Sequence, residues 1–165
     1  MSGKAPYELR LHGIEKEYDK LRKKYKLPKL EDMQKEFLFR IEDISPEPGM
    51  PHIHSVVYEI NKLLGAVARD TSSLLTAGSF CCMHEIKTFS RSEKERSFEL
   101  YKKVQKLIWK SRVDLLTGEE ACAKWILNVW KEWKHIKKET LWFNKKMYGA
   151  WAHFKEYEED LKYVK

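Results

Sequence analysis

Between Cys122 and Leu161, one largely apolar residue follows another at alternating steps of four and three along the chain. The series consists of Cys122, Ile126, Val129, Trp133, Ile136, Thr140, Phe143, Met147, Ala150, Phe154, Tyr157 and Leu161. This spacing matches a helix that packs lengthwise on a partner, whereas a strand would need alternation at every second residue. The pattern therefore predicts a long helix near the end of the sequence.

Such a helix is long for a small domain. Unbroken from residue 119 to residue 162, it would span about 65 Å at 1.5 Å per residue. A domain of 165 residues has a diameter of roughly 40 Å. The helix must therefore bend or restart, or it must extend beyond its domain and pair with another chain. Although no Pro or Gly lies within residues 133–141, we expect a bend there.

Two capping boxes indicate where helices begin. In this motif a Ser or Thr and a Glu three residues later each accept a hydrogen bond from the backbone at the helix start. Ser92 with Glu95 is one such pair, and Thr117 with Glu120, around Gly118, is the other. We predict a helix from Ser92, a tight turn at Gly118 and a second, antiparallel helix. The first of these helices should face inward through Tyr101, Val104, Ile108 and Leu115, with Phe98, Leu107 and Leu116 beside them.

Three further helices are predicted in the first half of the chain. They cover residues 7–26, residues 30–39 and a stretch from Pro51 towards Gly78. The third has the same four-three alternation, through Ile53, Val57, Ile60, Leu64, Val67, Thr71 and Leu74. Residues 79–90 fit one or two helical turns, and we interpret them as a short helix or an ordered connector.

These patterns together predict an all-α fold, a bundle of five or six helices with a long C-terminal helical hairpin. Residues 45–51 contain three prolines and a glycine, which exclude regular structure. Because the residues before them are too few for an independent core, we interpret them as a Pro-rich corner inside one domain. We therefore expect a single helical domain over residues 1–165, with residues 1–6 frayed.

One segment resembles a known group of proteins. Residues 24–37, KYKLPKLEDMQKEF, and residues 41–44, IEDI, resemble the opening of a group of uncharacterised all-helical archaeal proteins. Those proteins begin with a similar short helix, a Leu-Pro step and an acidic amphipathic segment. The resemblance implies a helical fold and an archaeal source, and it supplies no activity or functional residue.

Composition and the first residues of the sequence bear on the cellular location of the protein. Its three cysteines are an odd number, and Cys81 and Cys82 are neighbours, which is typical of reduced thiols. The sequence has no apolar stretch long enough for a membrane-spanning helix, and its polar start lacks the apolar region of a secretory signal. We therefore expect a cytoplasmic protein that has no membrane partner.

Motifs for catalysis or metal binding are not evident. His52 and His54 lie at one end of a predicted helix and Cys81, Cys82 and His84 beyond its other end, about 35 Å apart at 1.5 Å per residue. Neither group has the spacing of a structural zinc site. Glu132 and His135 have the spacing found in di-iron bundles, but such sites need a second copy. We therefore expect no metal and no cofactor, and an enzyme is the least favoured hypothesis.

Binding of another macromolecule is the favoured hypothesis, through a protein partner or self-association. All six tryptophans lie between Trp109 and Trp151. Most of them can be explained as core residues, but Trp and Tyr also anchor protein interfaces. The candidate partner surface consists of Leu141, Trp142, Tyr148 and Trp151.

Nucleic-acid binding is the alternative, because the chain has a formal net charge of +7 and its lysines form rows on predicted helices. The candidate contacts are Arg22, Lys23, Lys24, Lys102, Lys106, Lys110, Lys131 and Lys134. Against this alternative, lysine greatly outnumbers arginine and glutamate interrupts every row. Interleaved Lys and Glu residues are also typical of a solvated helix surface.

Overall fold

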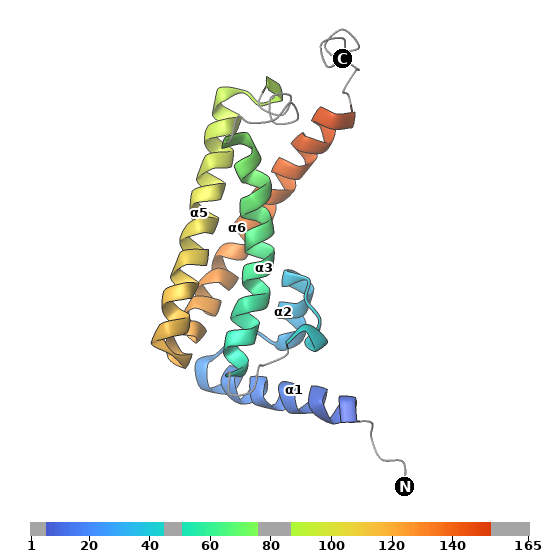
Figure 1. Cartoon of the computed structure of the whole chain (residues 1–165), viewed down its shortest axis with the longest axis vertical. Helices are drawn as coiled ribbons and strands as arrows, with labels where there is room; N and C mark the ends of the chain where they lie inside the picture. Colours follow the sequence, from blue (N-terminus) through green and yellow to red (C-terminus); the bar gives the residue numbers. More distant parts are fainter. Residues whose placement is uncertain (1–5, 45–50, 76–86, 153–165) are drawn as a thin grey trace, which may run out of the picture.

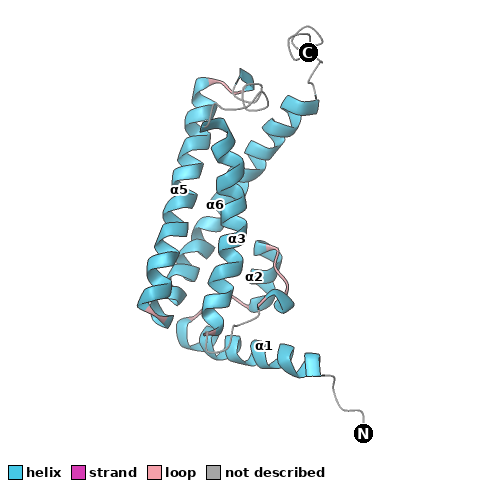
Figure 2. Cartoon of the chain, in the orientation of Figure 1, coloured by secondary structure: helices cyan, strands magenta, loops and turns pink. Residues whose placement is uncertain are grey.

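The computed structural model describes residues 6–44, 51–75 and 87–152, and within these ranges it contains helices and no strand (Figure 2). The predicted all-α fold is therefore confirmed. The α-helices are α1 (Pro6–Tyr25), α2 (Leu30–Phe37), α3 (His52–Ser72), α5 (Arg91–Thr117) and α6 (Glu119–Ala152), and the two 3-10 helices are η1 (Ile41–Asp43) and η2 (Ser73–Leu75). No helix in the described ranges has the length and apolar character that crossing a membrane would require.

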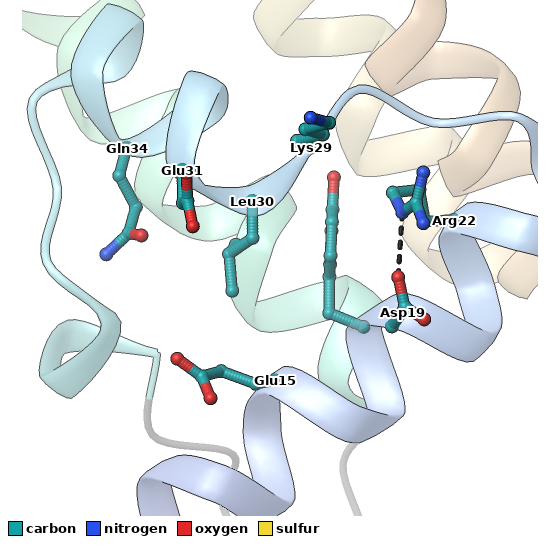
Figure 3. Close-up of a pocket in the computed structure, with 8 residues that line it drawn as sticks. Glu15, Asp19, Arg22, Lys29, Leu30, Glu31 and Gln34 are labelled. Carbon is teal, nitrogen blue, oxygen red and sulfur yellow. Dashed lines mark hydrogen bonds and ion pairs between the residues drawn. The ribbon is translucent and has the colours of Figure 1, made fainter.

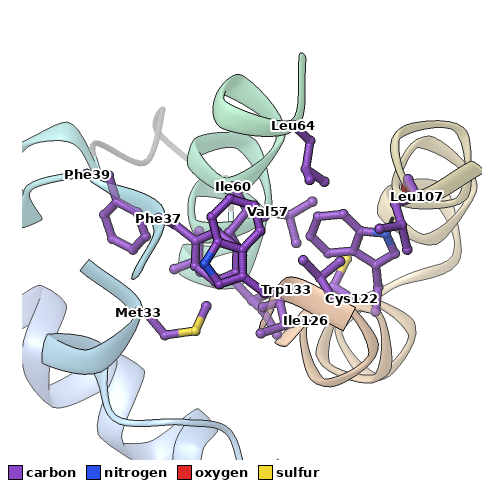
Figure 4. Close-up of a cluster of buried hydrophobic side chains, with 14 of the residues drawn as sticks. Met33, Phe37, Phe39, Val57, Ile60, Leu64, Leu107, Cys122, Ile126 and Trp133 are labelled. Atoms are coloured by element: carbon purple, nitrogen blue, oxygen red, sulfur yellow. Dashed lines mark hydrogen bonds between the residues drawn. The ribbon is translucent and has the colours of Figure 1, made fainter. Parts of the chain in front are cut away.

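Three long helices form the body of the molecule. Figure 1 shows α3 and α5 side by side, with α6 inclined behind them, α1 below the lower end of α3 and α2 at the side of α3. One core cluster draws on all five α-helices. Its centre is a set of fully buried residues that includes Met33 and Phe37 of α2, Ile60 and Leu64 of α3, and Ile126 of α6 (Figure 4).

The four-three pattern in α6 marks its buried side. Within the described part of the helix, Cys122, Ile126, Val129, Trp133, Ile136, Phe143 and Ala150 are buried. The helix runs without interruption from Glu119 to Ala152, so it does not restart in residues 133–141, and the bend that we expected there stays a prediction. Its 34 residues span about 51 Å at 1.5 Å per residue. Where α6 passes the start of α5, Leu74 and Phe89 cover Phe143.

The predicted antiparallel hairpin is present, but its caps differ from those predicted. Ser90 and Glu93, not Ser92 and Glu95, form the capping box at the start of α5. At its other end, Gly118 alone connects α5 to α6, with a positive φ of 127° that favours glycine. The Thr117 hydroxyl donates to the Val113 carbonyl instead of capping α6, and the first helical bond of α6 runs from Cys122 N to Gly118 O.

The buried side of α5 also differs from the prediction. We expected Tyr101, Val104, Ile108 and Leu115 to face inward; Val104 is fully buried, and the other three are partly buried and pack against the core. The buried residues of α5 are Ser97, Leu100, Val104, Leu107, Ser111 and Asp114. Three of the six are polar. The Ser97 hydroxyl donates to the Glu93 carbonyl, Ser111 Oγ donates to the Ile108 carbonyl and accepts from Asn61 Nδ2, and the Asp114 carboxylate pairs with Lys110. Small side chains allow α5 close to α3, which an apolar pattern cannot reveal.

The earlier helices agree with their predicted positions. α1 buries Ile14 and Tyr18, and all seven residues of the α3 pattern are buried, from Ile53 to Leu74. α2 ends at Phe37, two residues earlier than predicted, because Leu38 takes the left-handed conformation with φ 57°. The predicted frayed start, most of the Pro-rich corner and most of residues 79–90 lie outside the described residues. The single-domain organisation of residues 1–165 stays a prediction.

Candidate functional site

Acidic and basic side chains of α6 point in different directions. Glu132 pairs with Lys103 of α5, and Glu139 accepts two hydrogen bonds from Arg96 of α5, at 2.6 and 3.0 Å. The cation in each pair lowers the pKa of its glutamate. Both carboxylates are therefore charged near neutral pH and bind α6 to α5. The glutamates that interrupt the lysine row in the sequence do not interrupt it in space.

The outward side of α6 holds four exposed lysines, Lys131, Lys134, Lys138 and Lys145. No acidic side chain in the described part of the chain forms an ion pair with any of them. Steps of three, four and seven residues place them along one side of a helix, over about 21 Å at 1.5 Å per residue. They form a continuous strip of uncompensated positive charge.

An apolar row runs beside these lysines. Leu141 and Tyr148 lie three residues from Lys138 and Lys145, which makes them neighbours on the helix surface. Their exposed fractions are 55% and 77%. Trp130, four residues before Lys134, is half-buried. We name the combined surface the α6 outer face; it consists of Trp130, Lys131, Lys134, Lys138, Leu141, Lys145 and Tyr148.

A pocket of about 500 Å³ opens at one end of the α6 outer face. It lies between α2 and α6, and its lining residues are Glu36, Trp130, Lys131, Trp133, Lys134 and Lys137. Glu36 Oε2 accepts hydrogen bonds from Trp133 Nε1 at 3.0 Å and from Lys137 Nζ at 2.9 Å. The bond from Lys137 is the main cause that lowers the pKa of Glu36. Both donors are thus occupied within the protein.

The Phe37 ring of α2 packs against the two tryptophans that line this α2–α6 pocket. Its ring centroid lies 4.8 Å from that of Trp133 and 6.2 Å from that of Trp130, and both pairs are tilted. Trp133 is buried, while Trp130 keeps part of its ring exposed. Lys131 and Lys134 stand on the same pocket without an acidic partner in the described residues. This arrangement combines a fixed aromatic wall with two available cations.

The four residues of the predicted partner surface do not share one face. Leu141 and Tyr148 are exposed on the α6 outer face, and Trp151 is 40% exposed. Trp142 instead packs within the molecule, 6.3 Å from the Phe89 ring, and the Arg96 guanidinium lies 3.9 Å above it. Trp142 therefore contributes to the contact between α6 and α5.

Most of the predicted nucleic-acid contacts are neutralised by nearby carboxylates. Asp19 pairs with both Arg22 and Lys23, and Glu119 pairs with Lys24. On α5, Lys102 pairs with Glu99 and Lys110 with Asp114, while Lys106 is exposed and has no ion pair within the described residues. Of the eight candidates, Lys131 and Lys134 line one pocket together with two tryptophans, and neither has an ion pair within the described residues.

A second cavity, of about 330 Å³, lies between α1 and the start of α2 (Figure 3). Its polar groups hold the chain in place. Arg22 Nε donates to Asp19 at 2.8 Å, and the Tyr18 hydroxyl donates to the Pro28 carbonyl at 3.0 Å. Burial raises the pKa of Tyr18 well above its usual range. The bond from Tyr18 to Pro28 thus links α1 to the turn between the two helices.

The candidate metal ligands can be placed only in part. His52 and His54 are half-buried at the start of α3, whereas Cys81, Cys82 and His84 lie outside the described residues. Glu132, the carboxylate of the Glu-x-x-His spacing, is engaged by Lys103, and His135 is exposed. Within the described ranges, no group of three or more His, Cys, Asp or Glu residues is arranged to hold a metal ion.

Four residues of the α2–α6 pocket, Glu36, Trp130, Trp133 and Lys137, were absent from the predicted sites. Glu36 and Lys137 come together although 101 positions separate them, and no local pattern predicts such a contact. Trp130 precedes Lys131 directly and is four residues from Lys134. An aromatic residue beside two lysines on one side of a helix is therefore the signal that could have identified this end of the pocket.

Comparisons with known proteins add no further assignment. No protein-family model matches this chain, and searches of curated protein sequences and of solved structures found no match. The resemblance of residues 24–44 to archaeal helical proteins stays a prediction. The case for a function therefore depends on the chemistry of the α6 outer face and the pocket at its end.

Proposed function

We propose that this protein is a helical binding module that holds an acidic macromolecule on the α6 outer face. The observation that carries the proposal is the row of four lysines that have no acidic partner among the residues the structure describes. The other lysines of α6, at positions 124, 137 and 146, pair with Glu120, Glu36 and Glu93. The uncompensated charge is thus gathered on one side, where it attracts a polyanion over long range.

The apolar row supports a macromolecular partner over a small anion. Leu141 and Tyr148 would be covered by a ligand long enough to follow the lysines for about 21 Å. Aromatic and aliphatic side chains that are surrounded by charged groups are typical of interfaces in which a water-excluding contact is bordered by a polar rim.

The same charges argue against self-association through this face. A symmetric pair places the same patch of both copies in contact, which would bring two lysine rows together. Like charges at close range oppose such a contact. An acidic partner, in contrast, gains from every lysine in the row, and it releases counterions when it binds.

The proposal is tested with two labelled polyanions, oligothymidylate and polyglutamate, by fluorescence anisotropy at about 50 mM salt. We expect binding of at least one of them, and binding should weaken steeply as salt rises. For a single-stranded nucleic acid, four phosphate contacts predict a slope of about −3 for log K against log salt. Replacing Lys131, Lys134 and Lys138 by Glu should abolish binding.

A matched control makes the same charge change elsewhere. Lys16, Lys26 and Lys94 are also without an ion pair in the described residues but lie on α1, just after it, and on α5. Replacing these three by Glu should reduce binding far less. Equal losses in both triple variants would contradict a specific site. A mass of two chains by light scattering that falls to one in Tyr148→Ala would identify self-association instead.

A further inference from the structure

We propose that the α2–α6 pocket binds a nucleobase, so that the acidic macromolecule is a single-stranded nucleic acid. This inference rests on the proposed function, because it assigns a partner class to the same surface. It adds one structural element to the lysine row, namely the aromatic wall at its end.

The wall is suited to stacking. Phe37 contacts Trp130 at 6.2 Å and Trp133 at 4.8 Å, so neighbouring rings restrict the orientation of the Trp130 indole. Part of that indole is exposed in the pocket. Bases that are free of a duplex stack on such platforms with little dependence on sequence. The volume of about 500 Å³ lies within the range of small-ligand pockets, about 300–1,000 Å³.

The polar groups of the pocket suit a phosphate next to that base. Glu36 already accepts from Trp133 and Lys137, and it remains charged near neutral pH because these donors lower its pKa. Both of these bonds end on Glu36 Oε2, and the charge of Glu36 is offset by Lys137, so Lys131 and Lys134, which have no ion pair within the described residues, leave the pocket positively charged. Phosphate oxygens are acceptors only.

The rest of the α6 outer face offers further positive charge and a second aromatic side chain. Beyond the pocket, Lys138 and Lys145 continue the row, and Tyr148 is a second aromatic side chain with 77% exposure. It lies about 27 Å from Trp130 along the helix axis at 1.5 Å per residue. A single strand carries a charge and a flat ring in every unit, whereas an acidic peptide supplies the charges without a ring at each step.

The test distinguishes stacking of a base on Trp130 from attraction of the phosphates to the lysines. Binding of an oligothymidylate of about twelve nucleotides is compared, by anisotropy, with binding of an abasic strand of equal length and charge. The wild-type protein should prefer the strand with bases by at least about fivefold, since stacking on one aromatic side chain is worth about 1–3 kcal/mol. Trp130→Ala should remove most of this preference, with Tyr148 left as the aromatic side chain of the face, and should weaken binding of the abasic strand far less.

Two further variants guard against indirect effects. Trp130→Phe keeps an aromatic ring and should retain most of the preference. Trp109→Ala removes a tryptophan on α5 that is 60% exposed and lies beneath the Arg112 guanidinium at 4.3 Å, and it should have no effect. Folding of every variant is checked by circular dichroism.

Each outcome has a distinct meaning. Equal binding of the two strands would overturn the nucleobase inference while the proposed function stands. A tighter complex with polyglutamate than with either strand would identify an acidic protein as the partner and would also overturn it. If none of the three polyanions binds at about 50 mM salt, the proposed function itself is wrong.

Discussion

The two halves of α6 differ in what surrounds them. Residues 119–137 contribute Cys122, Ile126, Val129, Trp133 and Ile136 to the core that all five α-helices share. Residues 138–152 contribute Phe143 to a small separate cluster with Leu74 and Phe89. The first half therefore stabilises the fold, whereas the second half mainly extends the exposed surface. A long helix can serve both purposes because each turn repeats the same division between a buried and an outward side.

Core truncations should separate the two halves most strongly. Ile126 and Phe143 are both buried, with exposed fractions of 0% and 1%. Ile126→Ala should lower the free energy of unfolding by about 2–5 kcal/mol, the usual range for such a truncation in a core. Phe143→Ala should lower it less, since the loss cannot exceed the free energy with which residues 138–152 dock on the body.

Urea denaturation and hydrogen exchange measure this difference. In Phe143→Ala, amide exchange should accelerate within residues 138–152 and stay near the wild-type rate in residues 119–137, as expected for local opening. In Ile126→Ala, exchange should accelerate throughout the molecule. An equal loss of global stability in both variants, with uniform exchange, would show that α6 belongs to one cooperative unit.

The division within α6 also shows what the sequence could predict. The four-three pattern identified the buried side from Cys122 to Ala150, and the pattern in α3 was equally informative, because large apolar side chains in these helices face the core. The pattern was less complete in α5, where Ser97, Ser111 and Asp114 are buried as well. Periodicity detects apolar surface and overlooks polar residues whose side chains are satisfied by a backbone carbonyl, as in Ser97 and Ser111, or by an ion pair, as in Asp114.

The candidate site was less predictable than the fold. Lys131 and Lys134 were identified from charge alone, yet their significance depends on the pairing of Glu132 with Lys103 and of Glu139 with Arg96. The pocket depends in addition on Phe37 and Glu36, which reach α6 from α2. Contacts across such long stretches of chain follow from the packing of whole helices. No spacing within one segment encodes them.

As the pH falls, the second half of α6 should lose its packing on the rest of the molecule before the first half does. Glu139 pairs with Arg96, and Glu93 accepts from the Ser90 backbone and pairs with Lys146, so the pKa of each lies below its usual value of 4.5. A lowered folded-state pKa adds stability that is complete above the usual pKa and disappears as the pH falls through the folded-state pKa. The second half has few apolar contacts to compensate for this loss.

The indole N–H signals of two tryptophans report the outcome by NMR between about pH 7 and pH 3, a range that covers carboxylate titration. Trp142 lies against Phe89 and Arg96 in the second half. Trp125 donates to the Leu107 carbonyl in the first half. The Trp142 signal should change at the higher pH, and Glu139→Gln should move its transition towards neutral pH. Simultaneous changes in both signals would contradict the expected order.

The smallest predicted effect concerns the two ends of α5. Ser90 caps its start, beside the second half of α6, because its hydroxyl accepts from Glu93 N at 3.3 Å while its own N–H donates to the Glu93 carboxylate at 2.8 Å. Ser90→Ala should therefore destabilise the protein by about 1 kcal/mol. Thr117 has a similar hydroxyl at the other end, beside the first half, but it bonds only to the preceding turn, so Thr117→Ala should change stability by less than about 0.5 kcal/mol. Thermal and urea unfolding of both variants provide the measurement. A larger loss of stability in Thr117→Ala than in Ser90→Ala would mean that Thr117 caps α6 in solution and that the turn at Gly118 has another conformation.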